Sequence, residues 1–326
     1  MVTAAPPLVV AAPTKEPIRE LTSYTLDLAY GDSENNFELT TPERLAPGSL
    51  IWMDGTAYGG IIDVVQTNQT PLLTYKGRTW TGILDTRVIE PPPGADHRTV
   101  EGPAHQILQG LLDEAGLSGL FTVASTFPPV TMPTFQFDRY TTVWEGLTKL
   151  LTVNIAKLSV QCIHDRIDLT VLVGARIRAD GEHTRFTAAR DYHPVNHLIA
   201  LGKGELKDRE VLHLYADADG GISRTQTLTG LDEVQAVYEL SNADSTAELA
   251  AGAEKRLREL QSGRSAADID LSDASAEVEV GDMVTASDPV TGLTTTVRVV
   301  KKIVKVNASG ALTVSADVGD PNKNTR

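Results

Sequence analysis

Two stretches of the chain, more than two hundred residues apart, follow one plan. The first reads Pro47-Gly48-Ser49-Leu50-Ile51-Trp52-Met53-Asp54-Gly55 and leads into Gly60-Ile61-Ile62-Asp63-Val64-Val65. The second reads Val280-Gly281-Asp282-Met283-Val284-Thr285 and continues, past a turn at residues 288–292, to residues 297–303. Apolar runs separated by turn signals predict two related β-hairpins. If each belongs to a small barrel, a ring of such chains has twice as many near-equivalent positions as subunits, which indicates an adapter rather than an enzyme.

Length and composition indicate a folded, β-rich protein. With 326 residues the chain exceeds what one core usually organises, so two or more domains are expected. Hydrophobic residues make up 41% of the chain, enough to build real cores. The net charge of −14 argues against a protein that binds nucleic acid tightly, because that affinity comes largely from Lys and Arg side chains. Simple solubility of an acidic protein explains the charge equally well.

The single cysteine excludes a disulfide framework or a thiolate metal cluster within the chain. The residues around Cys162 indicate a buried structural thiol. The apolar stretch between Met1 and Pro17 is too short for a signal peptide and no Lys or Arg precedes it. No run of about 18 apolar residues predicts a membrane span. We therefore expect a protein that is made in a cytoplasm and kept there until it is assembled or released.

The first 92 residues predict an arm and a barrel. Residues 1–17 predict an extended N-terminal arm, because Pro6, Pro7, Pro13 and Pro17 withhold backbone donors. Residues 18–92 predict a first β-barrel, which we expect strands from residues 196–240 to complete. Its strand-like runs, separated by turn signals, lie at residues 24–28, 49–53, 59–65 and 72–75.

Residues 93–195 predict an α/β lobe. Pro103 suits the first turn of a helix, apolar residues recur at helical spacing as far as Ala115, and Gly116 suits a left-handed stop. A second helix begins at Thr142, where Thr142 and Glu145 form a capping-box pattern. Strands are expected to follow at residues 154–158 and 166–173.

Residues 241–326 predict a second β-barrel domain with a helix over residues 245–261. Ser245 and Glu248 form another capping box, and Gly263 ends the apolar repeat. Strands are expected before it at residues 197–202 and 211–216, and a polar tail after residue 318. The fold class is mainly β with α/β insertions (α+β), with two related small β-barrel domains and an inserted α/β lobe.

The histidines do not predict a metal site. His193 and His197 have i, i+4 spacing, but Pro194 lies between them, and a strand would hold their backbones about 13 Å apart. The remaining histidines are scattered singly, and surface or core packing explains each of them: His97, His105, His164, His183 and His213.

Two glycine-containing segments only partly match known catalytic motifs. Gly202-Lys203-Gly204-Glu205 lacks the ending of a phosphate-binding loop, so a hairpin turn is predicted there. Gly116-Leu117-Ser118-Gly119-Leu120 is one residue too short after the serine for a nucleophile elbow, and Ser118 is interpreted as a turn residue.

Acidic residues leave one catalytic hypothesis open. With 43 carboxylates in the chain, inspection does not exclude a glycosidase-like couple, and the candidates are Asp165, Asp168, Asp191, Asp217 and Asp219. Residues 217–221 also resemble a calcium loop but lack its distal Glu, so a hairpin turn is the better interpretation. We predict no catalytic, cofactor-binding or metal-binding residue and no cofactor.

A succession of motifs resembles a known family. Residues 77–89, followed by Pro91 and Pro92, then residues 139–147, then residues 279–284, are similar in order and spacing to the baseplate-hub, or tail-associated minor tail, proteins of long non-contractile-tailed phages. The resemblance covers residues 24–318. The motifs that carry it are strand and helix signatures.

The resemblance implies a homotrimeric phage tail-tip hub in the virion, at the distal end of the tail. Two related barrels per subunit would form a pseudo-sixfold ring that joins the sixfold tail to the threefold tip and lines the DNA channel. Its implied partners are the distal tail ring protein, the tape-measure protein, and tip or fibre proteins, with DNA passing through without specific binding.

Two other functions compete with a non-enzymatic hub. One is a cell-wall or capsule polysaccharide hydrolase that uses an Asp pair. The other is a glycan-binding receptor module, which needs exposed aromatic rings. Because Trp52, Trp80 and Trp144 all lie in apolar patterns, we expect these rings in the core rather than on a sugar-binding surface.

Overall fold

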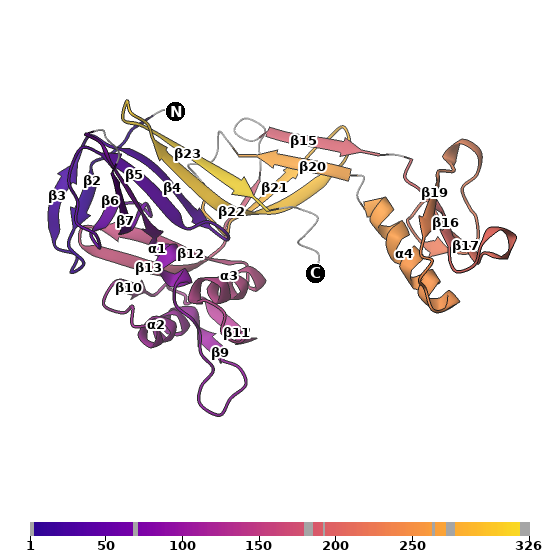
Figure 1. Cartoon of the computed structure of the whole chain (residues 1–326), viewed down its shortest axis with the longest axis horizontal. Coiled ribbons are helices and arrows are strands. Elements are labelled where there is room, and N and C mark those ends of the chain that lie inside the picture. The colour runs from indigo at the N-terminus through magenta and orange to yellow at the C-terminus, as the bar shows by residue number, and fades with distance from the viewer. Residues whose placement is uncertain are drawn as a thin grey trace. The chain divides into compact units, whose positions relative to one another are not determined.

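The computed structural model describes residues 3–67, 71–178, 185–191, 193–262, 265–271 and 278–319. Strand makes up 43% of the chain and helix 17%, so the predicted mainly β, α+β class is confirmed. The chain divides into two compact units (Figure 1). Unit 1 contains residues 1–185, 269–286 and 296–324, and unit 2 contains residues 186–268 and 287–295, with the last two residues of the chain.

A 12-stranded sheet forms the framework of unit 1. Its order is β1-β23-β22-β4-β5-β8-β7-β6-β2-β3, with β21 pairing with β22 and β14 pairing with β21. The strands are β1 (Thr3–Ala4), β2 (Leu8–Ala11), β3 (Pro17–Leu21), β4 (Thr25–Gly31), β5 (Asn36–Thr41), β6 (Leu50–Met53), β7 (Gly59–Thr67), β8 (Leu73–Thr79), β14 (Arg176–Arg178), β21 (Met283–Ser287), β22 (Thr294–Val306) and β23 (Ala311–Val318).

This sheet curls around one apolar core without closing into a barrel, which corrects the predicted barrel closure. Residues from both ends of the strand order meet in that core, among them Leu8 and Val10 of β2 and Val304 and Val306 of β22. Only three residues separate β1, at one end of the order, from β2, near the other. The chain itself therefore bridges the two ends of the sheet.

The predicted N-terminal arm is also corrected, because β1, β2 and the first residue of β3 lie within residues 1–17 and pair in the sheet. Strand β2 pairs with β3 on one side and β6 on the other, and Leu8 and Ala11 are fully buried. The prolines permit this because they lie outside β2 or at the start of β3, where a missing backbone donor is tolerated.

The second predicted hairpin enters the same sheet rather than a barrel of its own. Strand β22 pairs with β4, so that Val304 lies opposite Leu28. Strands β22 and β23 thus extend the N-terminal sheet, a place that we had expected strands of residues 196–240 to take. Pairing of strands so distant in sequence depends on side-chain packing in the folded core, and local sequence patterns do not encode it.

Helices and small sheets form a second layer of unit 1 (Figure 1). Its predicted helices are confirmed: α2 begins after Pro103, and Thr142 caps α3 by accepting from the Glu145 amide at 3.1 Å. The elements are α1 (Trp80–Asp85), β9 (Thr99–Pro103), α2 (Ala104–Glu114), β10 (Phe121–Ala124), β11 (Thr131–Gln136), α3 (Val143–Val153), β12 (Ala156–Ile163) and β13 (Arg166–Val173), with sheets β10-β13-β12 and β11-β9.

Unit 2 packs a helix against a four-stranded sheet of order β18-β17-β16-β19. Alternate residues of β16 and β17, such as Leu198 and Leu214, pack with Leu249 and Leu257 of α4. Ser245 caps this helix, as predicted. The elements are β15 (Arg185–Arg190), β16 (His197–Leu201), η1 (Leu206–Asp208), β17 (Val211–Ala216), β18 (Ile222–Ser223), η2 (Gly230–Asp232), β19 (Gln235–Glu239), α4 (Thr246–Ser262) and β20 (Ser265–Asp270), with β15 pairing with β20.

Candidate functional site

The two hairpins share backbone geometry as well as sequence. Gly48 has φ of +82° and its amide donates to the Ile62 carbonyl at 2.8 Å, while the Ile62 amide donates to the Ser49 carbonyl. Gly281 has φ of +98°, its amide donates to the Val299 carbonyl at 2.8 Å, and the Val299 amide donates to the carbonyl of the next residue, 282. The same two hydrogen bonds therefore open both hairpins.

The equivalence continues into a third strand. The register between β7 and β8 shifts immediately after Ile62, and the register between β22 and β23 shifts immediately after Val299. A shift of this kind is a β-bulge, which bends the strand that carries it. The repeated unit is therefore a bulged, three-stranded meander: β6-β7-β8 in one copy and β21-β22-β23 in the other. Both copies lie in the same sheet.

The copies differ at the residue that follows the glycine. Ser49 stands in the first copy, and Asp282 in the second. The Asp282 carboxylate is buried, lies 2.7 Å from Lys157 Nζ of β12, and accepts the backbone amides of Ala175 and Glu279. Asp282 therefore attaches the second copy to the helical layer of unit 1.

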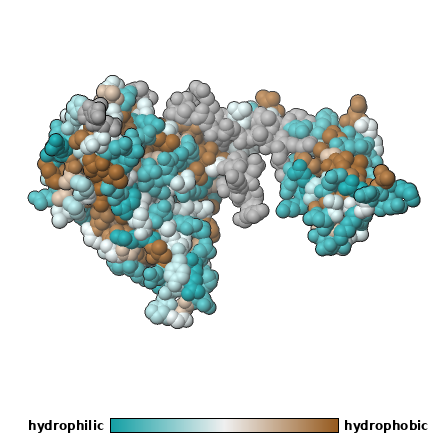
Figure 2. All heavy atoms as spheres, viewed as in Figure 1, coloured by the Kyte–Doolittle hydropathy of each residue, from teal (hydrophilic) through white to brown (hydrophobic). Residues whose placement is uncertain are grey.

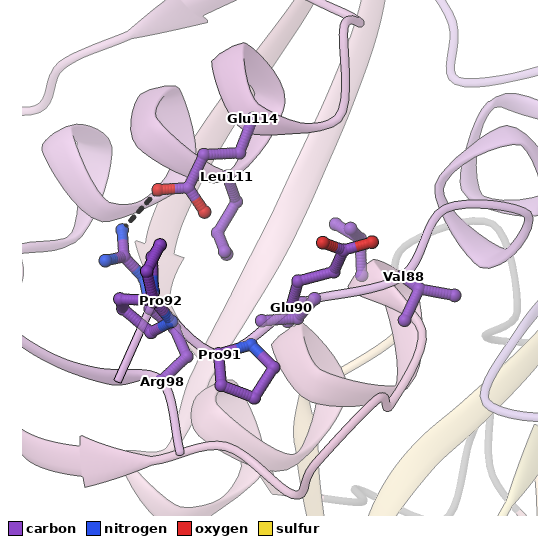
Figure 3. A pocket seen from close by; sticks show the side chains of 10 residues that line it. Val88, Glu90, Pro91, Pro92, Arg98, Leu111 and Glu114 are labelled. Carbon is purple, nitrogen blue, oxygen red and sulfur yellow. Dashed lines mark hydrogen bonds and ion pairs between the residues drawn. The ribbon is translucent and has the colours of Figure 1, made fainter. Parts of the chain in front are cut away.

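A hollow with a volume of about 430 Å³ lies beside α2 (Figure 3). Its wall is the segment from Val88 to Pro93, part of the sequence that resembles phage tail hubs. Figure 3 shows Glu90 and Glu114 on opposite sides of the hollow, with Leu111 between them. The lining residues are Val88, Ile89, Glu90, Pro91, Pro92, Pro93, Arg98, Leu111, Glu114 and Val143.

The polar chemistry of this hollow is one ion pair. Arg98 Nη2 lies 2.6 Å from Glu114 Oε1, while Arg98 Nε is buried and has no hydrogen-bond partner among the described residues. The lining combines two carboxylates and one guanidinium with proline and aliphatic side chains. Charged groups beside proline and aliphatic side chains suit contact with protein side chains, and the lining set contains no histidine and no serine or cysteine nucleophile.

The acids proposed for a hydrolase serve turns and strands. Asp168 pairs with Arg166 at 2.7 Å, and Asp191 accepts from the His193 amide. Asp217 accepts from the amides of residues 219 and 221, which makes the segment a hairpin turn, as predicted. Asp165 is exposed in the turn between β12 and β13, and Asp219 is exposed in the turn after β17.

The other candidate segments are also structural. Residues 202–205 form the predicted turn: the Gly202 and Glu210 amides bond across the hairpin, and Gly204 has φ of +98°. Ser118 donates to Asp113 Oδ1 in a turn. Trp52, Trp80 and Trp144 are 2%, 1% and 6% exposed, so they lie in the core, as predicted. Those three rings therefore cannot stack on a sugar.

The predicted burial of Cys162 is confirmed, because its side chain is inaccessible. Burial raises the pKa of its thiol to about 12. A thiol in that environment stays protonated at neutral pH and is not a nucleophile.

The sequence did not predict the cluster of His197, His213 and Glu233. His197 does not act with His193; instead its Nε2 lies 2.7 Å from Nδ1 of His213, and its Nδ1 lies 2.7 Å from Oε1 of Glu233. The interpretation of His213 as an isolated histidine is therefore wrong. The two histidines are sixteen residues apart, and only the register of β16 and β17 brings them together.

The described ranges are those given above for the structure. Within them, no group of three or more His, Cys, Asp or Glu side chains is arranged to hold a metal ion. None of the described helices has the length and apolar character that crossing a membrane requires.

Several large apolar side chains stand in solvent at loop tips. Phe127 is 100% exposed, Leu231 96%, Leu206 94% and Val290 87%. Figure 2 shows apolar residues scattered among polar ones on both units. These four side chains lie singly on separate segments, and isolated apolar residues of this kind are ordinary on the surface of a folded protein.

Comparison with known proteins found no matching family model and no matching curated protein. Among solved structures, similar ones include a prophage tail protein from Listeria monocytogenes EGD-e (TM-score 0.49, 14% identity, 97% of this chain and 95% of that chain). A tail protein from Neisseria meningitidis MC58 has a TM-score of 0.46 and 14% identity, with 96% of each chain covered. The 43 kDa tail protein of prophage MuSo2 from Shewanella oneidensis has a TM-score of 0.46 and 13% identity, with 97% of this chain and 99% of that chain covered. These three similar structures are tail proteins, two of them from prophages, at 13% to 14% identity to this chain.

Proposed function

We propose that this chain is a structural protein of a phage tail and that it forms the hub of the tail tip. Three copies would make a ring at the distal end of the tail, joining the sixfold tail to the threefold tip and surrounding the DNA channel. Its neighbours would be the distal tail ring protein, the tape-measure protein, and tip or fibre proteins.

The repeated meander is the observation that carries this proposal. Each chain presents the same bulged three-stranded unit twice, with matching hydrogen bonds at Gly48 and Gly281. Three chains would therefore present six related units, and a trimer could meet a sixfold ring through similar contacts at every position. The motif succession that resembles phage tail hubs includes residues 279–284, which form the turn that opens the second of these units.

Two further features support a structural role. The candidate acids act in turns and ion pairs, and the only cysteine is a buried thiol with a raised pKa.

The charge of the chain fits passage of DNA. With a net charge of −14, a ring of copies would repel phosphates wherever acidic side chains face the channel. DNA could then move through the ring without binding to it.

The stoichiometry of the purified full chain tests the proposal. Light scattering and native mass spectrometry, with and without the adjoining sixfold tail protein, are expected to show a species of three times the 35.0 kDa chain mass. A chain that stays monomeric under both conditions contradicts the hub. Hydrolysis of cell-wall polysaccharide that Asp168→Asn abolishes would contradict it independently and favour the hydrolase.

A further inference from the structure

A chain of three side chains crosses the sheet of unit 2 on the face opposite α4. The His197 ring, 6% exposed, lies between the Glu233 carboxylate and the His213 ring, with 2.7 Å separating the polar atoms on each side. Glu233 precedes β19, His197 begins β16 and His213 lies in β17. The three side chains therefore link three neighbouring parts of one sheet.

Register explains why the two histidines meet. Residue 197 lies opposite Tyr215 and residue 199 lies opposite His213, so the two histidines are diagonal neighbours on one face. The Tyr215 ring packs on the His197 ring with 4.3 Å between centroids. Leu198 and Ala200, the intervening residues of β16, face the α4 core instead.

The hydrogen bonds restrict where protons can lie. An ionised carboxylate only accepts, so His197 Nδ1 donates to Glu233. The contact between His197 Nε2 and His213 Nδ1 then needs one donor and one acceptor. If both rings were protonated, both atoms would carry hydrogens and neither could accept. The pair can therefore bind one extra proton and keep its bond, but not two.

The Glu233 carboxylate beside the pair stays ionised. Hydrogen bonds from Gln235 and then His197 hold the pKa of Glu233 below its usual range, so its negative charge persists as pH falls. Among the described residues, the Tyr215 ring packs on His197, and the neutral Gln235 amide donates to Glu233. Beside Glu233, the Asp232 carboxylate lies 4.0 Å from His193 Nε2.

We propose that His197 and His213, oriented by Glu233, form an acid-sensitive latch that holds β17 on β16. Folded unit 2 accepts one proton at the pair, whereas the opened or unfolded chain accepts two. Because the opened chain binds one more proton than folded unit 2, a fall in pH stabilises the opened chain relative to the folded one. Acidification therefore weakens the latch. Histidines change charge between about pH 5 and 8, which sets the range in which the effect is expected.

Ring-nitrogen NMR of the full wild-type chain, recorded between pH 8 and 5, tests the proton count. While the β17 amides stay protected from exchange, one ring of the pair is expected to keep an unprotonated nitrogen. When the signal of that unprotonated ring nitrogen disappears, amide hydrogen exchange across residues 211–216 should become faster. Two fully protonated rings beside a β17 that remains protected would overturn the latch.

A variant isolates the contribution of the second proton. In His213→Asn, the amide oxygen can accept from Nε2 of a protonated His197, and the amide NH2 group can donate to Nε2 of a neutral His197, so a hydrogen bond is available in both states. Corrected for intrinsic rates, exchange in β17 of the wild type should rise roughly tenfold per pH unit below the histidine range, and that of His213→Asn should stay flat. His164→Asn, at an exposed position in unit 1, is the control and should follow the wild type. An equal acid response in His213→Asn and wild type would overturn the proposal; if His213→Asn does not fold, the wild-type ring spectra decide.

Discussion

The buried carboxylate of Asp282 is expected to contribute strongly to the stability of unit 1. Its carboxylate meets the Lys157 ammonium and two backbone amides where solvent is excluded. Asp282→Ala leaves a charged lysine without its partner, so we expect the free energy of unfolding to fall by about 3 to 5 kcal/mol. Urea unfolding measures this loss.

Asp138→Ala is the matched control for that substitution. Asp138 also pairs with a lysine, Lys149, at 2.6 Å, but both side chains are largely in solvent. Exposed pairs contribute little, so this variant should unfold close to the wild-type midpoint. Equal losses in the two variants would show that Asp282 does not clamp the layers together.

Two tyrosines and one cysteine with raised pKa values predict that the protein loses stability at alkaline pH. Burial raises the pKa values of Tyr24, Tyr58 and Cys162 to about 12, from ordinary values of 10.0 for tyrosine and 9.0 for cysteine. The unfolded chain releases these protons first, so the contribution of these three groups to stability is constant below about pH 9 and falls as pH rises toward 12. Tyrosinate absorbance should therefore rise together with unfolding. Ionisation of all tyrosines near pH 10 in a folded chain would contradict this prediction.

The glycine turns that open the two copies of the meander allow the same substitution to be compared at two equivalent positions. Both Gly48 and Gly281 have positive φ, so alanine at either position is strained by about 1 kcal/mol. A Cβ at Gly48 would meet nothing closer than 4.0 Å, whereas at Gly281 it would lie 2.6 Å from Lys157 Cβ. Gly281→Ala should therefore lose roughly 1–3 kcal/mol more than Gly48→Ala in denaturant titrations. Equal losses would mean that the second turn is not packed against β12.

Local signals in the sequence predicted elements well and their partners poorly. Caps at Thr142 and Ser245 located α3 and α4, because capping is a contact between residues three apart. The pairing of β22 with β4 joins residues about 270 positions apart and depends on a common core. Prolines near the N-terminus predicted an arm, yet β2 fits between them.

The features of the candidate site also differ in whether the sequence could predict them. The glycine turns and the buried tryptophans could be predicted, since each follows from a short pattern. The His197–His213 contact could not, because diagonal neighbours on a sheet are set by strand register, which a shift of one residue would destroy.

In the assembled particle, the repeated meander would let the proposed trimer contact a sixfold ring at six similar positions. Two copies within a subunit lie in one curled sheet, so their spacing is set by the fold of unit 1 rather than by a flexible linker. A rigid spacing is what a ring of three subunits needs if it is to offer six similar contacts to a neighbouring sixfold ring.

Electron cryomicroscopy of intact phage particles that carry this protein tests the hub proposal. Reconstruction of the tail tip should show three copies around the tail axis at its distal end, with both meanders of every copy directed toward the sixfold ring above. Copies placed away from that axis, or a ring in which only one meander of each subunit meets its neighbour, would contradict the proposed hub.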